Sequence, residues 1–429
     1  MRAPIRLATA ALTLMFALLP GTPTAARAQE TGVTLRLEYR PGSKTSLMVL
    51  PIRGASGDSV AAILSRDLDF SDRFTIVPSS AATQPNGPLN FPVFSKLAVD
   101  GVVQGTLLPS GWLRVALHDV AKSIVVNQKD FPLATGVGDA NWRQGVHSIS
   151  DAIEEWVTGQ RGIAATRVAY VRDSRIWTVD SDGANPRAVT SQGMSPQWLP
   201  NGRALAYSVN LGVRDPIMIT DLSTGAQRTL TSANGMQDLA PAVSRDGRTL
   251  VFTRVSENGA DLHVMPVDGG TPQRITVGRG KGSFQPSFSP DGQRLVFASD
   301  RSGRSDVYIS DVDGTNVELL TAGSYGERGD RYSPDWSPDG RLVAYHGEVG
   351  GSIQVMTINL RDQSVKQVTS DGRNEDASWA PDARHLVFTS QRSGTRQLWI
   401  TDIETGRTRQ LTRGSAARLA AWSPRLTSP

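Results

Sequence analysis

The sequence predicts a small mixed α/β domain followed by an all-β, six-bladed β-propeller that the C-terminal strand closes. Three observations support this fold class: a phrase that recurs from residue 166 onward, strand patterns that each occur six times, and array ends that are out of phase. The chain of 429 residues is also too long for one ordinary core. Its 41 glycines and 25 prolines suit a turn-rich β architecture.

The recurring phrase is clearest at residues 285–297, which read QPSFSPDGQRLVF. By subtraction of residue numbers, the equivalent positions in successive copies lie 45, 45, 48, 43 and 43 residues apart. These positions are Trp198, Val243, Phe288, Trp336, Trp379 and Trp422. Periods in the low to middle forties are typical of four-stranded propeller blades.

Each copy predicts the same four strands. An inner strand, usually with an aromatic residue, is followed by a tight turn of the Pro-Asp-Gly kind, which presets the backbone for reversal. A β-rich second strand, an alternating third strand and an outer strand complete the copy. The outer strand ends in threonine each time, at Thr190, Thr231, Thr276, Thr321, Thr369 and Thr412.

The two ends of the array predict a closed ring. The array begins with a second strand at residues 167–171 and stops after an inner strand at residues 420–424. The last strand can therefore complete the first blade, which removes two exposed sheet edges. An open solenoid is the alternative, but it would usually carry polar capping units, and neither end resembles one.

The region before the repeats, residues 29–160, predicts a small sheet with packed helices, and residues 161–429 form the predicted propeller. Residues 160–166 are the expected hinge. Strands are expected at residues 34–39, 47–52, 74–77, 101–107, 112–120 and 124–131. Apolar residues recur at helical spacing over residues 58–68 and 142–156, so these two segments are expected to be helices.

The N-terminal 28 residues predict a cleavable signal peptide and therefore a periplasmic location. Two early arginines precede an apolar run at residues 7–19, and small residues before Gln29 favour cleavage between Ala28 and Gln29. An uncleaved anchor helix is the alternative. Cleavage would remove three arginines and no acid, so the formal net charge of +4 would fall to +1.

The composition and motifs predict a binding protein without catalytic, cofactor or metal sites. The absence of cysteine excludes disulfides and thiol chemistry. The five histidines are not spaced like metal ligands, and no G-x-S-x-G motif occurs. No Lys/Arg run suggests nucleic acid or an anionic membrane. A propeller hydrolase or lyase, and a binder of small molecules or cell-wall fragments, remain alternatives.

The repeats resemble the TolB-type, WD40-like propeller repeat with its Ser-Pro-Asp-Gly turn. Residues 35–39 with 47–52, residues 67–78 and residues 156–170 are also similar to the periplasmic TolB family of the Tol-Pal system. The resemblance implies a non-enzymatic, monomeric scaffold that supports outer-membrane integrity and cell division. It further implies that the propeller binds a peptidoglycan-associated lipoprotein (Pal-like).

The resemblance also implies that the mature N-terminus engages an inner-membrane, TolA-like protein, here through Glu30, Thr31, Val33, Leu35 and Leu37. On the propeller, loops that join each outer strand to the next inner strand share one face with loops that join second and third strands. We call this the loop face. The partner contact is expected there, at Gln237, Asp238, Phe284, Gln285, Arg331, Tyr332, Glu375, Asp376 and Arg418.

Overall fold

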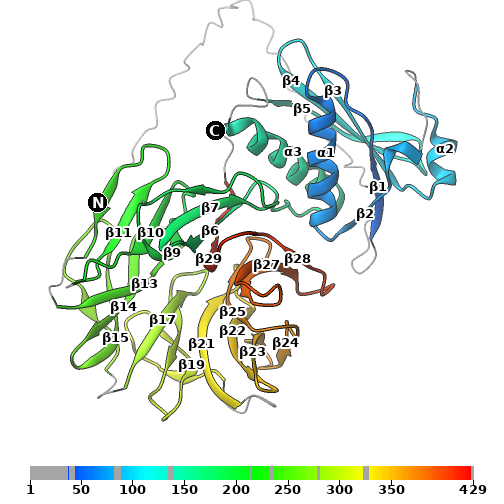
Figure 1. The fold of residues 1–429 in the computed structure, drawn as a ribbon. Helices are drawn as coiled ribbons and strands as arrows, with labels where there is room; N and C mark the ends of the chain where they lie inside the picture. Colours follow the sequence, from blue (N-terminus) through cyan, green and yellow to red (C-terminus); the bar gives the residue numbers. More distant parts are fainter. Residues whose placement is uncertain are drawn as a thin grey trace, which may run out of the picture. The chain divides into compact units, whose positions relative to one another are not determined.

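The computed structural model places a five-stranded sheet with its helices before six four-stranded sheets (Figure 1). The residues that it describes are 37, 44–81, 88–133, 140–212, 214–231, 235–277, 281–321 and 328–426. The predicted leader, its cleavage point at Ala28 and Gln29, and the expected partner residues Glu30, Thr31, Val33 and Leu35 lie outside these residues.

The first sheet has the strand order β2-β1-β3-β4-β5. The strands are β1 Thr45–Val49, β2 Phe74–Ile76, β3 Gly101–Leu107, β4 Trp112–Asp119 and β5 Ile124–Pro132. β1 runs parallel to both β2 and β3, whereas β3, β4 and β5 form an antiparallel meander. The expected strands within residues 47–131 are therefore present. The strand expected at residues 34–39 lies outside the described residues except for Leu37.

Two amphipathic helices supply the core of this α/β part. The helices are α1 Gly57–Phe70 and α3 Ala140–Thr158, which lie side by side in Figure 1. The face of α1 that carries Ile63 and Leu64 and the face of α3 that carries Ile149 and Ile153 are buried in one apolar cluster. Among the described residues, no helix is long and apolar enough to cross a membrane.

A short helix, α2 Phe91–Lys96, has no counterpart in the sequence expectations. It is six residues long and has proline in its first turn, so it presents too few turns to show helical periodicity. Phe94 is its buried anchor and packs in a small cluster beneath the sheet with Met48 and Val102. A 3₁₀ turn, η1 Ser79–Ala81, precedes it.

The six remaining sheets are the predicted blades, and each is antiparallel. Their strands are β6 Arg167–Arg172, β7 Arg175–Asp180, β8 Arg187–Ala188, β9 Met194–Trp198, β10 Ala204–Ser208, β11 Ile217–Asp221, β12 Gln227–Thr229, β13 Gln237–Val243, β14 Thr249–Ser256, β15 Gly259–Pro266, β16 Gln273–Arg274, β17 Ser283–Phe288, β18 Arg294–Ser299, β19 Asp306–Asp311, β20 Glu318–Leu319, β21 Arg328–Trp336, β22 Leu342–Val349, β23 Ser352–Asn359, β24 Val365–Gln367, β25 Asn374–Trp379, β26 His385–Ser390, β27 Gln397–Asp402, β28 Thr408–Gln410 and β29 Arg418–Trp422.

The C-terminal strand closes the ring, as predicted. β29 pairs antiparallel with β6, with Trp422 opposite Val168 and Ala421 opposite Ala169. The indole Nε1 of Trp422 donates a hydrogen bond to Thr166 Oγ1 at 2.8 Å, which fastens the end of the chain to the start of the array. β29 also contacts the inner strands β9 and β25 of the two neighbouring blades, so the series of inner strands is continuous.

The recurrent threonine has a structural reason. Outer strands are only two or three residues long, and the threonine that follows each one accepts a hydrogen bond from the backbone N–H of the third strand. The six pairs are Ile176 with Thr190, Ile217 with Thr231, Leu262 with Thr276, Val307 with Thr321, Val355 with Thr369, and Leu398 with Thr412.

Every inner strand bends at a β-bulge, where a non-glycine residue takes a left-handed conformation with φ between 49° and 55°. These residues are Ser195, Ala240, Gln285, Ser333, Asp376 and Leu419. The bulges place the inner strands around a central cavity.

Candidate partner-binding surfaces and the interface between the two parts

The inner strands enclose a cavity of about 590 Å³ on the propeller axis. Its lining is unequal around the ring. Polar side chains gather on β17, β21 and β25, whereas β13 and β29 contribute apolar residues, half of them alanine. Two of the expected contact residues, Gln285 and Asp376, lie at bulges in this lining.

A chain of hydrogen bonds joins three bulges across adjacent blades. Gln285 Nε2 donates to Ser333 Oγ at 2.9 Å, and Ser333 Oγ donates to Asp376 Oδ1 at 2.9 Å. The backbone N–H of Asp376 donates to His346 Nδ1 at 3.2 Å. Burial raises the pKa of Asp376 and lowers the pKa of His346, because a charge on either group would be poorly solvated. The side of the cavity formed by β17, β21 and β25 therefore presents neutral hydrogen-bonding groups.

Asp335, two residues after Ser333 on β21, connects the strands that form this side of the cavity. Its carboxylate accepts hydrogen bonds from Ser287 Oγ at 3.0 Å and from the backbone N–H of Trp379 at 2.9 Å, and so connects β17, β21 and β25. Burial raises the pKa of Asp335 to about 6, although these hydrogen bonds oppose the shift. The sequence marked this residue only as part of a turn phrase.

Seven of the nine residues expected on the loop face are at least partly exposed. Gln237 and Arg418 are exposed, and Phe284, Gln285, Tyr332, Glu375 and Asp376 are partly exposed. Tyr332 lies beside His346 with 6.1 Å between ring centroids. Glu375 forms ion pairs with both Arg373 and Arg396, each at 3.1 Å.

The other two are buried and pair with charged groups of the propeller itself. Asp238 is 1% exposed and accepts two hydrogen bonds from Arg254, at 2.7 and 2.9 Å. Arg331 is also 1% exposed and pairs with Asp306. The expectation that these two side chains contact a partner is corrected accordingly. The sequence carries no signal for this burial, because both residues belong to polar loop segments.

Leu37 needs a similar correction. It was expected in the N-terminal partner segment, but its side chain is 5% exposed and belongs to the apolar core of the α/β part, with Leu47 and Leu117. Leu47 and Leu117 lie on β1 and β4, which both neighbour β3 in the sheet. Leu37 therefore contributes to folding of the α/β part.

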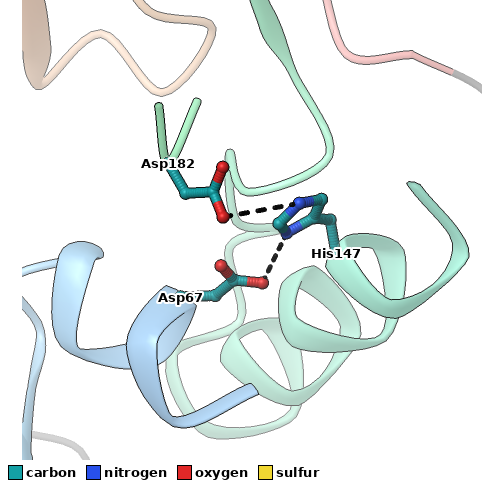
Figure 2. A group of neighbouring side chains, drawn as sticks. All are labelled: Asp67, His147 and Asp182. Carbon is teal, nitrogen blue, oxygen red and sulfur yellow. Dashed lines mark hydrogen bonds and ion pairs between the residues drawn. The ribbon is translucent and has the colours of Figure 1, made fainter. Parts of the chain in front are cut away.

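A second polar centre lies where the α/β part meets the propeller (Figure 2). Asp182, in the turn between β7 and β8, has a side chain that is fully buried. It pairs with the guanidinium groups of Arg66 on α1 and Arg143 on α3. Its Oδ2 atom also lies 3.9 Å from His147 Nε2, while His147 Nδ1 lies 2.7 Å from Asp67 Oδ2.

Charge explains how these groups tolerate burial. Burial favours the neutral imidazole of His147, but the carboxylates of Asp67 and Asp182 outweigh it and raise the pKa of His147. Burial opposes ionisation of Asp182 too, yet His147, Arg143 and Arg66 keep its pKa below the ordinary value. One propeller carboxylate is thus compensated by three basic groups of the α/β part.

The reverse arrangement occurs at the last blade. Arg407, in the turn between β27 and β28, donates to Asp69 at 2.7 Å and to Asp72 at 3.0 Å. His385 lies between Asp382, at 2.7 Å, and Asp72, at 3.5 Å. Although burial favours the neutral ring, these carboxylates raise the pKa of His385 to about 9.

Neither histidine cluster fits a metal site. The groups Asp67–His147–Asp182 and Asp72–His385–Asp402 bring carboxylate oxygens and imidazole nitrogens within 4.8 Å of one another. However, guanidinium groups already pair with Asp182, with Asp72 and, from Arg384, with Asp402. A metal ion would have to displace these cations, so the clusters are ion-pair networks. The sequence could not reveal them, since their members lie far apart along the chain.

The interface predicts a loss of stability at alkaline pH. An unfolded histidine has a pKa near 6.5, so the stabilisation from His385 is complete below that pH and is lost as pH rises through about 9. Burial raises the pKa of Glu154 to about 8 and that of Asp151 to about 6. Because both values lie above those of the unfolded chain, each group also makes the folded state less stable as pH rises, at lower pH than His385 does.

We therefore expect the free energy of unfolding, measured by urea titration, to fall between pH 7 and 9.5. The slope for a single proton is at most about 1.4 kcal/mol per pH unit. The His385→Gln variant should be less stable at pH 7 and should lack the part of the decline that lies between the unfolded pKa near 6.5 and the folded pKa of about 9. His263→Gln, a partly exposed histidine stacked on Phe252, is the control. A parallel decline in His385→Gln would contradict the assignment.

Comparisons with known proteins agree with this architecture. The chain is 34% identical over 201 residues to the Tol-Pal system protein TolB of Methylococcus capsulatus, which covers 43% of this chain and 46% of the relative. It is 29% identical over 259 residues to the TolB protein of Xanthomonas oryzae pv. oryzae, with 55% and 57% covered. The chain thus spans about half the length of the curated relatives it matches.

A solved structure and a family model extend the likeness. The crystal structure of TolB from Acinetobacter baumannii superposes with a TM-score of 0.77 over 90% of this chain and 98% of that one. At 24% sequence identity this likeness establishes the fold. The family model described as PD40, TolB beta propeller domain, matches residues 154–426, which is more than half of the sequence. The chain therefore belongs to the PD40 family of TolB beta propeller domains.

Proposed function

We propose that this chain is a non-enzymatic, periplasmic scaffold of the Tol-Pal system that acts by binding other proteins. The observation that carries the proposal is the closed TolB-family propeller together with curated relatives that are named Tol-Pal system protein TolB. In this role the chain is exported by its leader and links the inner-membrane Tol complex to an outer-membrane, peptidoglycan-associated lipoprotein. It thereby supports outer-membrane integrity and cell division.

The lipoprotein contact is proposed on the loop face. The contact set is Gln237, Phe284, Gln285, Tyr332, Glu375, Asp376 and Arg418, without the two buried residues. Support comes from the interface between the two parts, which uses the turns after β7, β25 and β27 at the opposite ends of the blades. The loop face is therefore not occupied by those contacts.

The second proposed contact is a TolA-like protein that engages Glu30, Thr31, Val33 and Leu35 near the mature N-terminus. Deleting residues 30–35 from the mature chain tests this proposal. The deletion should abolish capture of the TolA-like protein and leave capture of the lipoprotein unchanged, measured by chemical cross-linking in envelope fractions. Equal capture of both proteins by the deleted chain would contradict it.

The test of the lipoprotein contact is a titration calorimetry measurement with the soluble domain of the lipoprotein. Tyr332→Ala should weaken binding at least about 10-fold, because a partly buried aromatic side chain in a contact surface commonly contributes more than about 1.4 kcal/mol. The matched control is Trp112→Ala, which removes an exposed aromatic from the α/β part, 43% exposed. Native affinity in Tyr332→Ala, or weakened binding in the control alone, would overturn the proposed face.

A further inference from the structure

Three arginines of the propeller are held rigidly by aromatic rings. Each guanidinium group lies over two rings, one from the second strand and one from the third strand of its own blade. The centroid distances are 5.3 and 5.3 Å for Arg172 over Tyr170 and Trp177, 5.3 and 4.9 Å for Arg301 over Phe297 and Tyr308, and 5.3 and 4.9 Å for Arg392 over Phe388 and Trp399.

All three lie at the loop face. Arg172 is the last residue of β6, and Arg301 and Arg392 follow the ends of β18 and β26. They therefore occupy the connections between second and third strands, which share this face with the proposed contact residues. Each side chain is partly exposed, so a ligand can reach it.

Another blade contains an arginine that stacks on one aromatic ring and whose charge is already compensated. Arg254, at the corresponding end of β14, lies 5.2 Å from the ring centroid of Phe252. Its Nε and Nη2 atoms donate to the two carboxylate oxygens of Asp238 on the inner strand β13. Asp238 stands two residues before the left-handed bulge residue Ala240.

The corresponding inner-strand position carries no acid in the three blades that contain Arg172, Arg301 and Arg392. It is Ala417 beside Arg172, Ser283 beside Arg301 and Asn374 beside Arg392, each two residues before its bulge. In the first blade the register matches that of Arg254, since Arg418 lies opposite Val171 as Gln237 lies opposite Val255. In the other two blades Ser283 and Asn374 lie opposite Ser299 and Ser390, and the arginine follows two residues later. In none of the three blades does this inner-strand position supply a carboxylate.

The hydrogen bonds of the three arginines go to neutral acceptors. Arg172 donates to the carbonyl oxygen of Arg413. Arg301 donates to hydroxyl oxygens of Ser299 and Ser283. Arg392 donates to Ser390 Oγ and Asn374 Oδ1. Within the described ranges no carboxylate lies within ion-pair distance of any of the three.

The surroundings of these arginines do not fully compensate their charge or satisfy their donors. Burial lowers the pKa of Arg301 and of Arg392, which means that the surroundings disfavour their charge. Arg172 has in addition a buried Nε atom without a hydrogen-bond partner. An incoming carboxylate would favour the charged form of Arg301 and Arg392, and the stacked rings already hold each of the three guanidinium groups in place for it.

We propose that Arg172, Arg301 and Arg392 form a recognition surface for an acidic segment of a protein partner, with each guanidinium taking one Asp or Glu carboxylate as Arg254 takes Asp238. The internal pair supplies the chemistry, since it is a carboxylate held by two N–H donors of one guanidinium. The assignment of that partner as the lipoprotein rests on the proposed function, whereas the preference for carboxylates does not.

The test uses the full mature chain and its Arg172→Gln/Arg301→Gln/Arg392→Gln variant. The first probe is a hexaglutamate peptide, with hexalysine as its opposite, followed at low salt through tryptophan fluorescence, because Trp177 and Trp399 lie under two of the arginines. Hexaglutamate should bind the native chain and lose at least about 10-fold in affinity for the variant, and 0.3 M salt should weaken native binding.

The second probe is the soluble domain of the lipoprotein. Its affinity should also fall at least about 10-fold in the triple variant, and its salt dependence should flatten. Arg254→Gln is the matched control: it removes an arginine that stacks on one ring at the same face and whose charge is satisfied internally, so it should lower the free energy of unfolding and leave both affinities unchanged. If the triple variant does not fold, the single Arg301→Gln and Arg392→Gln variants carry the same test.

The outcomes separate the two proposals. Hexaglutamate that binds native and variant chains equally, or no better than hexalysine, overturns the recognition surface. An anionic lipid vesicle or an oligonucleotide that competes better than hexaglutamate overturns the choice of a protein partner. A native chain that binds hexaglutamate through the three arginines but does not bind the lipoprotein contradicts the Tol-Pal assignment and leaves the recognition surface standing.

Discussion

A chain that ends at Arg413 is expected to lose cooperative folding of the propeller. The truncation removes β29, the inner strand of the first blade, and with it the pairing to β6. It also removes Trp422, whose side chain is 6% exposed and whose indole bonds to Thr166. Loss of one buried tryptophan alone costs about 3–5 kcal/mol. Because total stabilities are about 5–15 kcal/mol, loss of the whole strand should exhaust the margin.

Circular dichroism during urea titration measures this effect, and a chain that ends at Leu426 is the control because it keeps β29. A synthetic peptide of residues 414–429, added to the truncated chain, should restore part of the cooperative transition by pairing with β6. An unchanged transition in the truncated chain would show that the ring does not depend on closure by this strand.

Arg331→Ala is expected to lower the free energy of unfolding by about 3–5 kcal/mol, the usual cost of removing one partner of a buried ion pair. The guanidinium of Arg331, on β21, pairs with Asp306 on β19 of the preceding blade, and both side chains are at most 3% exposed. The variant leaves the Asp306 carboxylate buried with Ser302, Arg304 and Thr321 as its remaining contacts. The effect should therefore appear in stability, in contrast to the partner-binding role that the sequence suggested.

Denaturant titration of three variants measures this prediction. Tyr332→Ala changes the neighbouring, partly exposed residue and should shift the unfolding midpoint little. Removing both charges in Arg331→Met/Asp306→Leu should recover much of the lost stability, because no uncompensated charge then remains buried. Equal destabilisation by Arg331→Ala and Tyr332→Ala would contradict the structural role of Arg331.

The blades and their closure could be predicted because their signal is local and repeated. A turn phrase, an alternating strand and a terminal threonine recur with nearly constant spacing, and each acts through contacts within its own blade. The same holds for α1 and α3, whose helical periodicity matches the faces that are buried. α2 escaped detection because a six-residue helix has no periodicity to read.

The candidate site was predicted less completely, since polarity in a loop does not reveal exposure. Tyr332 and Glu375 are partly exposed as expected, whereas Arg331 and Asp238 are buried although they belong to similar loop segments. The difference depends on how neighbouring strands and blades cover each side chain, and the sequence around each residue does not contain that information.

The sequence by itself determined the number of blades, the closure of the ring and the absence of thiol chemistry. Composition and the repeated local pattern carry the first and the last, and the phase of the two array ends carries the closure, because a lone inner strand at one end can pair only with the blade that lacks one. Only the tertiary structure decided which charged groups are paired. It placed Asp182 among basic groups of α1 and α3, and it left Arg172, Arg301 and Arg392 without the carboxylate that Arg254 has. The physical reason is that the energy of a buried charge depends on which distant residues folding brings within a few ångströms of it.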